Sequence, residues 1–170
     1  MRLKIGRPDL AAYSTHFDLP RAAADAPLTV SWAGVTTLLI DDGSSAVMTD
    51  GFFSRPSLFA VAARPLTPSR RRIDAALSRL RVQRLDAVTP VHTHFDHAMD
   101  SAVVADLTGA RLIGGTSAGL IARGHGLTSF DLTAPGQSVQ AGAYDITLIE
   151  GAHCPPDRFP GVITEPVTPP

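Results

Sequence analysis

The stretch His92-Thr93-His94-Phe95-Asp96-His97 directly follows the mostly apolar run from Asp86 to Val91. It places three imidazoles and one carboxylate within six residues, at the end of an expected strand. Neutral imidazole and carboxylate groups are the ligands that suit zinc and similar divalent ions. The stretch therefore predicts a metal site just beyond this strand.

The spacing within the stretch divides the four ligands into two pairs. Side chains of an extended segment alternate with period two, so His92 and His94 point to the same side and can hold one ion together. Asp96 and His97 come where the chain turns into a helix expected from Ala98, and they can face a second ion. An aspartate at a helix N-terminus is also favourable for the helix dipole.

A catalytic zinc has three protein ligands and one open position for water. The best candidate for the third ligand is His153, which follows an expected strand at residues 144–149. A lone histidine in a loop is more often simply solvated, so this assignment depends on the histidine-rich stretch. Asp50 ends another expected strand. It can accept a hydrogen bond from a ligand histidine, or it can cap the turn at Gly51, and the sequence leaves both readings open.

Composition limits the other classes of function. A chain of 170 residues with 44% hydrophobic residues fits one domain with a sizeable core. The net charge of −1 provides no field that would attract nucleic acid or an anionic membrane. Cys154 is the one cysteine, which favours an inert thiol and a reducing compartment. With no signal-like or membrane-spanning apolar run, we expect a cytoplasmic protein with a small-molecule substrate.

The order of the expected elements indicates an α/β fold with mixed sheets. A lead-in at residues 1–27, with at most one short helix, precedes three strands that meander through turns, and later strands alternate with helices. Strands are expected at residues 28–32, 35–40, 46–50, 87–91, 111–114, 130–132 and 144–149. Helices are expected from Pro68 to Leu80 after an N-cap at Thr67, at 98–107 with a closing Gly109, and at 116–122. Loops are expected at 51–66 and 123–126, and an irregular, proline-rich tail at 154–170.

The motif His92-x-His94-x-Asp96-His97 resembles the signature of the metallo-β-lactamase-fold hydrolases. Two other segments resemble the subgroup of ascorbate-6-phosphate lactonase-like and N-acyl-phosphatidylethanolamine phospholipase D-like proteins. They are Trp32-x-Gly34 with the following Thr36-Thr37-Leu38-Leu39-Ile40, and Thr49-Asp50-Gly51-Phe52-Phe53-Ser54-Arg55-Pro56. The resemblance covers about residues 28–160 and implies an αββα sandwich of two similar halves.

Carried over by position, the resemblance implies that His92, His94 and His153 hold one zinc, and that Asp96 and His97 serve a second. Family members that hold two irons for redox work place a glutamate where this chain has His94, so the resemblance disfavours redox chemistry.

The chain departs from the family pattern after His153. The family takes a bridging aspartate and a last histidine from its second half, whereas here no histidine follows His153 and the later acids are Asp157 and Glu165. We therefore expect residues 1–170 to form a single, partial domain that is the N-terminal part of a longer protein or lacks the second half. In the latter case the second ion would be poorly held.

The predicted function is a metal-dependent hydrolase acting on an ester, lactone or phosphodiester. One or two zinc ions, or Mn²⁺ or Fe²⁺ instead, would activate a water molecule that Asp96 holds or deprotonates. The alternative is a catalytically incomplete metal-binding half-domain that is stabilised by its ion or by self-association into a homo-oligomer. A metal-free binding module would require the histidine-rich stretch to be accidental.

Overall fold

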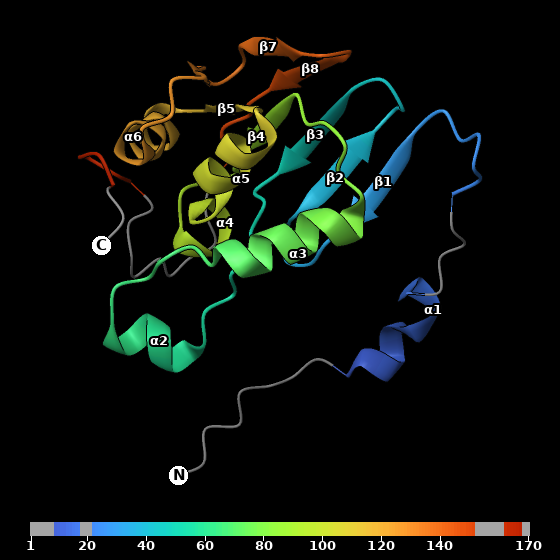
Figure 1. Ribbon diagram of the computed structural model, residues 1–170, viewed down its shortest axis with the longest axis horizontal. Coiled ribbons are helices and arrows are strands. Elements are labelled where there is room, and N and C mark those ends of the chain that lie inside the picture. Colours follow the sequence, from blue (N-terminus) through green and yellow to red (C-terminus); the bar gives the residue numbers. More distant parts are fainter. Residues whose placement is uncertain (1–8, 18–21, 152–161, 168–170) are drawn as a thin grey trace.

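A six-stranded mixed sheet forms the centre of the computed structural model, which describes residues 9–17, 22–151 and 162–167 (Figure 1). The strands are β1 (Thr29–Trp32), β2 (Leu38–Asp41), β3 (Ala46–Thr49), β4 (Ala87–Thr89), β5 (Arg111–Gly114) and β6 (Phe130–Leu132), and they lie in that order across the sheet. The pairs β1–β2 and β2–β3 are antiparallel, and β3–β4, β4–β5 and β5–β6 are parallel. A second sheet is the antiparallel hairpin of β7 (Ser138–Ala141) and β8 (Tyr144–Thr147).

Helices connect the parallel strands, as parallel pairing requires. The chain crosses from β3 to β4 through α2 (Leu58–Ala63) and α3 (Arg70–Leu80), from β4 to β5 through α4 (Phe95–Ala98) and α5 (Ser101–Thr108), and from β5 to β6 through α6 (Thr116–His125). A 3₁₀ turn, η1 (Leu10–Tyr13), and α1 (Ser14–Phe17) precede β1. None of the described helices is both long and apolar enough to cross a membrane.

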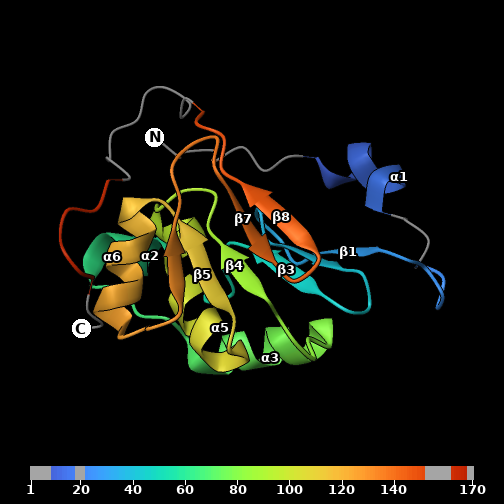
Figure 2. The same ribbon diagram turned by 90° about the horizontal axis from the view of Figure 1, so that it is seen from above.

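Side-chain alternation along the central strands gives the sheet two buried faces. Figure 2 shows α3 and α5 on one side of the sheet and the β7–β8 hairpin on the other. The helix side is filled by a cluster that includes Met48, Val88, Leu112, Ile73 and Val104. The hairpin side is filled by Val47, Ala87, Ile113 and Ala141. Adjacent residues of β3, β4 and β5 thus point to opposite layers, as strand geometry dictates.

The expected α/β class with a mixed sheet is confirmed. The meander of the first three strands and the later alternation with helices are both present, and Gly109 ends α5 with a φ of 71°. In the described residues the layers are helices, the six-stranded sheet and the two-stranded hairpin. Most of the expected tail at 154–170 lies outside the described residues.

The first residues expected for one strand, β2, and for one helix, α3, were wrong. The strand expected from Val35 begins at Leu38, because Val35 has a φ of 53° and the Thr37 N–H donates to Gly34 O at 3.1 Å in a tight turn. The helix expected after Thr67 begins at Arg70 instead. Its N-cap is Ser69, whose own N–H donates to Ser54 Oγ at 2.5 Å, so a contact with a distant segment sets the start of α3.

Three further segments differ from expectation. The expected loop at 51–66 contains α2, capped by Ser57 Oγ, which accepts from the Ala60 N–H at 3.2 Å. Helix α6 continues through the expected loop at 123–126 and ends at Gly126, whose φ is 83°. Strand β7 was not expected, because a single large apolar residue, Val139, gives its sequence little strand character.

Candidate metal centre

The candidate ligands lie at the carboxyl edge of the sheet, where side chains from parallel strands meet. Asp50 follows β3 directly, and His92 comes three residues after the end of β4. Two hydrogen bonds join these loops: the Asp50 N–H donates to Thr89 O at 3.0 Å, and the Val91 N–H donates to Asp50 Oδ1 at 2.9 Å. The sheet thereby fixes the position from which the histidine-rich stretch begins.

The three histidines of the stretch lie against one another. His92 Nε2 is 3.0 Å from His94 Nδ1, and the two ring centroids are 4.8 Å apart in an edge-on arrangement. The ring of His97 lies 3.9 Å from that of His92, measured between centroids. The expected common side for His92 and His94 agrees with this geometry. His97, which was expected to face a second position, is part of the same cluster.

His97 is buried and held by a carboxylate beneath it. Its Nδ1 is 2.9 Å from Oδ2 of Asp50, and the Asp50 side chain has no exposure to solvent. The Thr36 hydroxyl contacts the same Asp50 oxygen and lies 2.9 Å from His97 Nδ1. A carboxylate acceptor favours the proton on Nδ1 and leaves the lone pair on Nε2, which is the arrangement of a histidine that binds a metal. Asp96 Oδ2 lies 3.8 Å from that Nε2.

The backbone at Asp50 is turned sharply to make this contact. Asp50 has a φ of 54° and Gly51 a φ of 76°, both in the left-handed region that most residues avoid. The Ser101 hydroxyl, at the start of α5, donates to Asp50 O. The helix that follows the histidine-rich stretch therefore helps to hold the turn on which Asp50 sits.

Asp100 anchors the next part of the same segment. Its buried carboxylate accepts hydrogen bonds from the Phe53 N–H at 2.7 Å, the Ser54 N–H at 2.5 Å and the Ser54 hydroxyl at 2.6 Å. Burial raises the pKa of Asp100, and the hydrogen bonds from Ser54 and Phe53 oppose part of this rise. The loop after β3 is thus fixed to the start of α5 at two successive residues, Asp100 and Ser101.

Sequence reasoning missed Thr36, Asp100 and Ser101. A signal existed for Thr36: the β2–β3 pairing aligns Leu39 with Met48, and extending it two residues brings Thr37 opposite Asp50 and Thr36 next to it. The roles of Asp100 and Ser101 had no local signal, because their partners are 46 to 51 residues away along the chain.

The donor set fits a divalent cation. Three imidazoles and one carboxylate lie close together beyond the end of β4, and the buried Asp50 contacts one of the imidazoles, that of His97. As they stand, no three His, Cys, Asp or Glu side chains among residues 9–17, 22–151 and 162–167 surround a common point. His92 Nε2 and His94 Nδ1 instead face each other. His153, the expected third ligand, and Cys154 lie outside the described residues.

The described residues thus form a mixed α/β fold with a histidine cluster at the carboxyl edge of its parallel strands. No protein-family model matches the chain. It is similar to a UPF0173 metal-dependent hydrolase of Methylobacterium nodulans, with 28% identity over 124 residues, which are 73% of this chain and 48% of the relative. The chain therefore spans about half the length of the curated relative it matches.

Solved structures of metallo-hydrolases are also similar. A novel metallo hydrolase of the archaeon Ignicoccus hospitalis matches with a TM-score of 0.46 and 13% identity, over 66% of this chain and 42% of that one. A subclass B3 metallo-β-lactamase from a soil metagenome library matches with a TM-score of 0.48 and 17% identity, over 71% of this chain and 47% of that one.

Proposed function

We propose that this chain carries metal-binding residues of a metal-dependent hydrolase with the metallo-β-lactamase fold. His92, His94 and His153 would hold one ion, and Asp96 and His97 would serve a second. The observation that carries the proposal is the pairing of His97 Nδ1 with the fully buried Asp50 at 2.9 Å, which leaves His97 Nε2, 3.8 Å from Asp96 Oδ2, as the nitrogen that can bind a metal ion. Similarity to the metal-dependent hydrolase of Methylobacterium nodulans supports the reaction class.

The role that we propose for each residue follows from the exposure of its side chain to solvent. A bound zinc ion, or Mn²⁺ or Fe²⁺ in its place, would activate water and polarise the scissile carbonyl or phosphoryl group. Asp96, whose side chain is 45% exposed beside His97, would hold the attacking water and accept its proton. Asp50, which is fully buried against His97, would act by fixing the His97 ring.

The proposed substrate is a small ester, lactone or phosphodiester. These bonds all suit attack by an activated water, and they are consistent with the resemblance to the lactonase-like and phospholipase D-like subgroup. A cytoplasmic location is proposed from the single cysteine, which permits no disulfide within the chain.

Metal content and turnover test the proposal together. Protein purified without chelators should contain stoichiometric zinc, manganese or iron, and His94→Ala should lose most of it. His125→Ala is the matched control, because His125 lies on α6 and pairs with Asp106 at 3.8 Å. Hydrolysis of 4-nitrophenyl esters or bis-4-nitrophenyl phosphate should stop on chelation and return with metal. Unchanged metal content in His94→Ala would contradict the proposal.

A second candidate is a metal-binding half-domain without catalytic activity of its own. It is favoured by the arrangement of the side chains, because no three His, Cys, Asp or Glu side chains among the described residues surround a common point. This candidate predicts metal binding with a large thermal shift and no chelator-sensitive turnover.

A further inference from the structure

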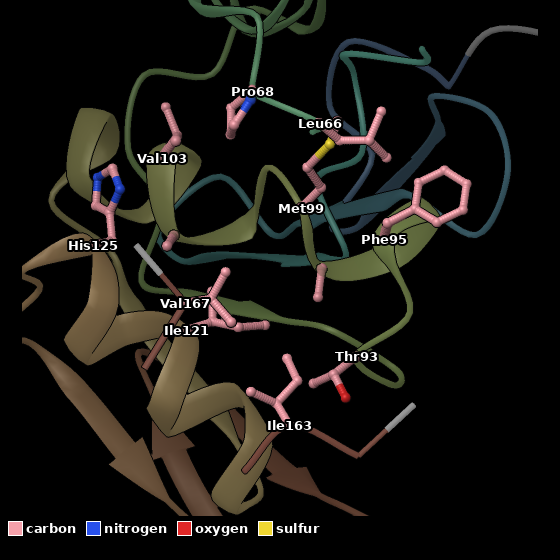
Figure 3. Close-up of a pocket in the computed structure, with 12 residues that line it drawn as sticks. Leu66, Pro68, Thr93, Phe95, Met99, Val103, Ile121, His125, Ile163 and Val167 are labelled. Carbon is pink, nitrogen blue, oxygen red and sulfur yellow. The ribbon is translucent and has the colours of Figure 1, made fainter. Parts of the chain in front are cut away.

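An apolar pocket opens beside the histidine-rich stretch, on the side away from the sheet (Figure 3). Its volume is about 270 Å³, and its walls come from the loop before α3, from α4 and α5, from α6, and from the segment at 162–167. Thr93 and Phe95 form one end and His125 the opposite end, with Met99 between them (Figure 3). Apart from Thr93 and His125, its lining residues are apolar.

The segment at 162–167, which forms one wall of the pocket, packs against α6. The Ile163 N–H donates to Ser117 Oγ at 3.1 Å. Val167 lies so close to α6 that a Cβ on Gly124 would meet Val167 O at 2.0 Å. Both Ile163 and Val167 line the pocket, so the segment at 162–167 closes one side of it.

The pocket borders the histidine-rich stretch at Thr93 and Phe95. These two residues alternate with His92, His94 and Asp96 in the stretch. Thr93 also lines a second cavity, of about 250 Å³, which includes His92 and the start of α6. A group bound in the apolar pocket at its Thr93 end would therefore lie next to the stretch that carries the candidate ligands.

We propose that the apolar pocket binds an uncharged apolar group of the substrate, a short acyl or aryl substituent next to the bond that is hydrolysed. This inference rests on the proposed function. The ionisable side chain in the lining, His125, is at the far end and pairs with Asp106, so the lining near Thr93 favours an uncharged group. Sites for whole drug-sized ligands measure about 300–1,000 Å³, so a pocket of about 270 Å³ suits part of a small substrate.

Binding is tested without turnover. Sodium hexanoate, titrated against protein with labelled methyl groups, should shift the NMR signals of Val103 and Ile121, and sodium acetate should shift them far less. Val103→Phe fills the pocket and should abolish the shift at Ile121. Val30→Phe is the matched control, because Val30 is 58% exposed on β1 and lines none of the cavities described here.

Turnover supplies a second readout. The wild-type protein should hydrolyse 4-nitrophenyl hexanoate with a kcat/KM about tenfold above that for the acetate, since each buried methylene favours the longer chain. Val103→Phe should bring this ratio close to one, Val103→Ala should raise it, and Val30→Phe should keep it.

The outcomes separate the two proposals. If hexanoate shifts the Val103 and Ile121 signals but neither the esters nor bis-4-nitrophenyl phosphate are cleaved, the pocket still binds an apolar group and the hydrolase proposal fails. If esters are cleaved with the same chain-length ratio in wild type and Val103→Phe, the pocket assignment is overturned. It is also overturned if hexanoate shifts neither signal, or shifts them only after removal of residues 168–170, which would make the chain's own end the occupant.

Discussion

At the scale of single residues, the pairing of Asp50 with His97 joins positions 47 residues apart and places a fully buried carboxylate against one of the candidate ligands. Asparagine has nearly the same size as aspartate, but its amide nitrogen cannot accept a hydrogen bond. We predict that Asp50→Asn lowers zinc affinity about 10- to 100-fold, because the one amide oxygen of asparagine cannot accept from both the Val91 N–H and His97 Nδ1, and asparagine lacks the charge that favours the pairing with His97. Competition with a chromophoric chelator measures this affinity.

The control for Asp50→Asn is Asp74→Asn. Asp74 is an exposed residue of α3 that pairs with Arg70 one helical turn away. Asp74→Asn should leave zinc affinity unchanged. Equal affinities in wild type and Asp50→Asn would show that Asp50 merely stabilises the turn at Gly51, which is the other reading that the sequence left open.

Asp100 gives a prediction about pH. Because its pKa is raised in the folded protein, the native state binds more protons than the unfolded chain between about pH 4 and the raised pKa. Its contribution to stability is therefore fully present below about pH 4 and is lost as the pH rises through that raised pKa. Asp100→Asn removes the titration while keeping an acceptor oxygen for the Phe53 and Ser54 N–H groups.

Urea unfolding at a series of pH values checks the Asp100 prediction. The free energy of unfolding of the wild type, relative to that of Asp100→Asn, should fall as the pH rises from about 4. Asp74→Asn serves again as the control and should follow the wild type. A relative stability that rises with pH would show that the hydrogen bonds to Asp100 outweigh its desolvation.

At the scale of elements, the turn from β5 into α6 is tightly packed. A Cβ on Gly114 would lie 2.5 Å from the Cβ of Ala118, which cannot rotate away. We predict that Gly114→Ala destabilises the protein by about 1–3 kcal/mol. Ala118→Gly alone should cost about 1 kcal/mol through helix propensity. The double variant should lose less free energy of unfolding than the two single variants lose together, because the added methyl group on residue 114 then meets no Cβ at position 118. Thermal or urea unfolding measures this difference.

How far elements could be predicted from sequence depended on whether their signals were local. The alternating strands and the glycine after α5 were predicted because those signals lie within each segment. The start of α3 was not, because Ser69 is held by Ser54 from a distant loop. Strand β7 was missed because its pairing with β8, rather than its own composition, defines it. In the candidate centre, period two put His92 and His94 together, but nothing local indicated that Asp100 holds the Asp50 loop.

At the scale of the whole molecule, folding packs the stretch that carries the described candidate ligands against Asp50, at the end of β3. A ligand that binds the native state at 100 times its dissociation constant stabilises it by about 2.7 kcal/mol. For a chain of this size we predict that zinc at such a concentration raises the melting temperature by about 5–10 °C. The shift should vanish with a chelator and in His94→Ala, and persist in His125→Ala. Calorimetry measures it, and an equal shift in His94→Ala would place the binding elsewhere.

The order of the central sheet, β1 to β6 with each strand beside its predecessor in the chain, has a consequence for biosynthesis. When a strand leaves the ribosome, the partner it needs has already been made, so the sheet can grow from one edge as synthesis proceeds. No strand of this sheet has to wait for a later one to be inserted between it and its neighbour. The growing edge would pass from β1 to β6, and Asp50 would be synthesised before the histidines that pack against it and before Ser101, which helps to hold its turn.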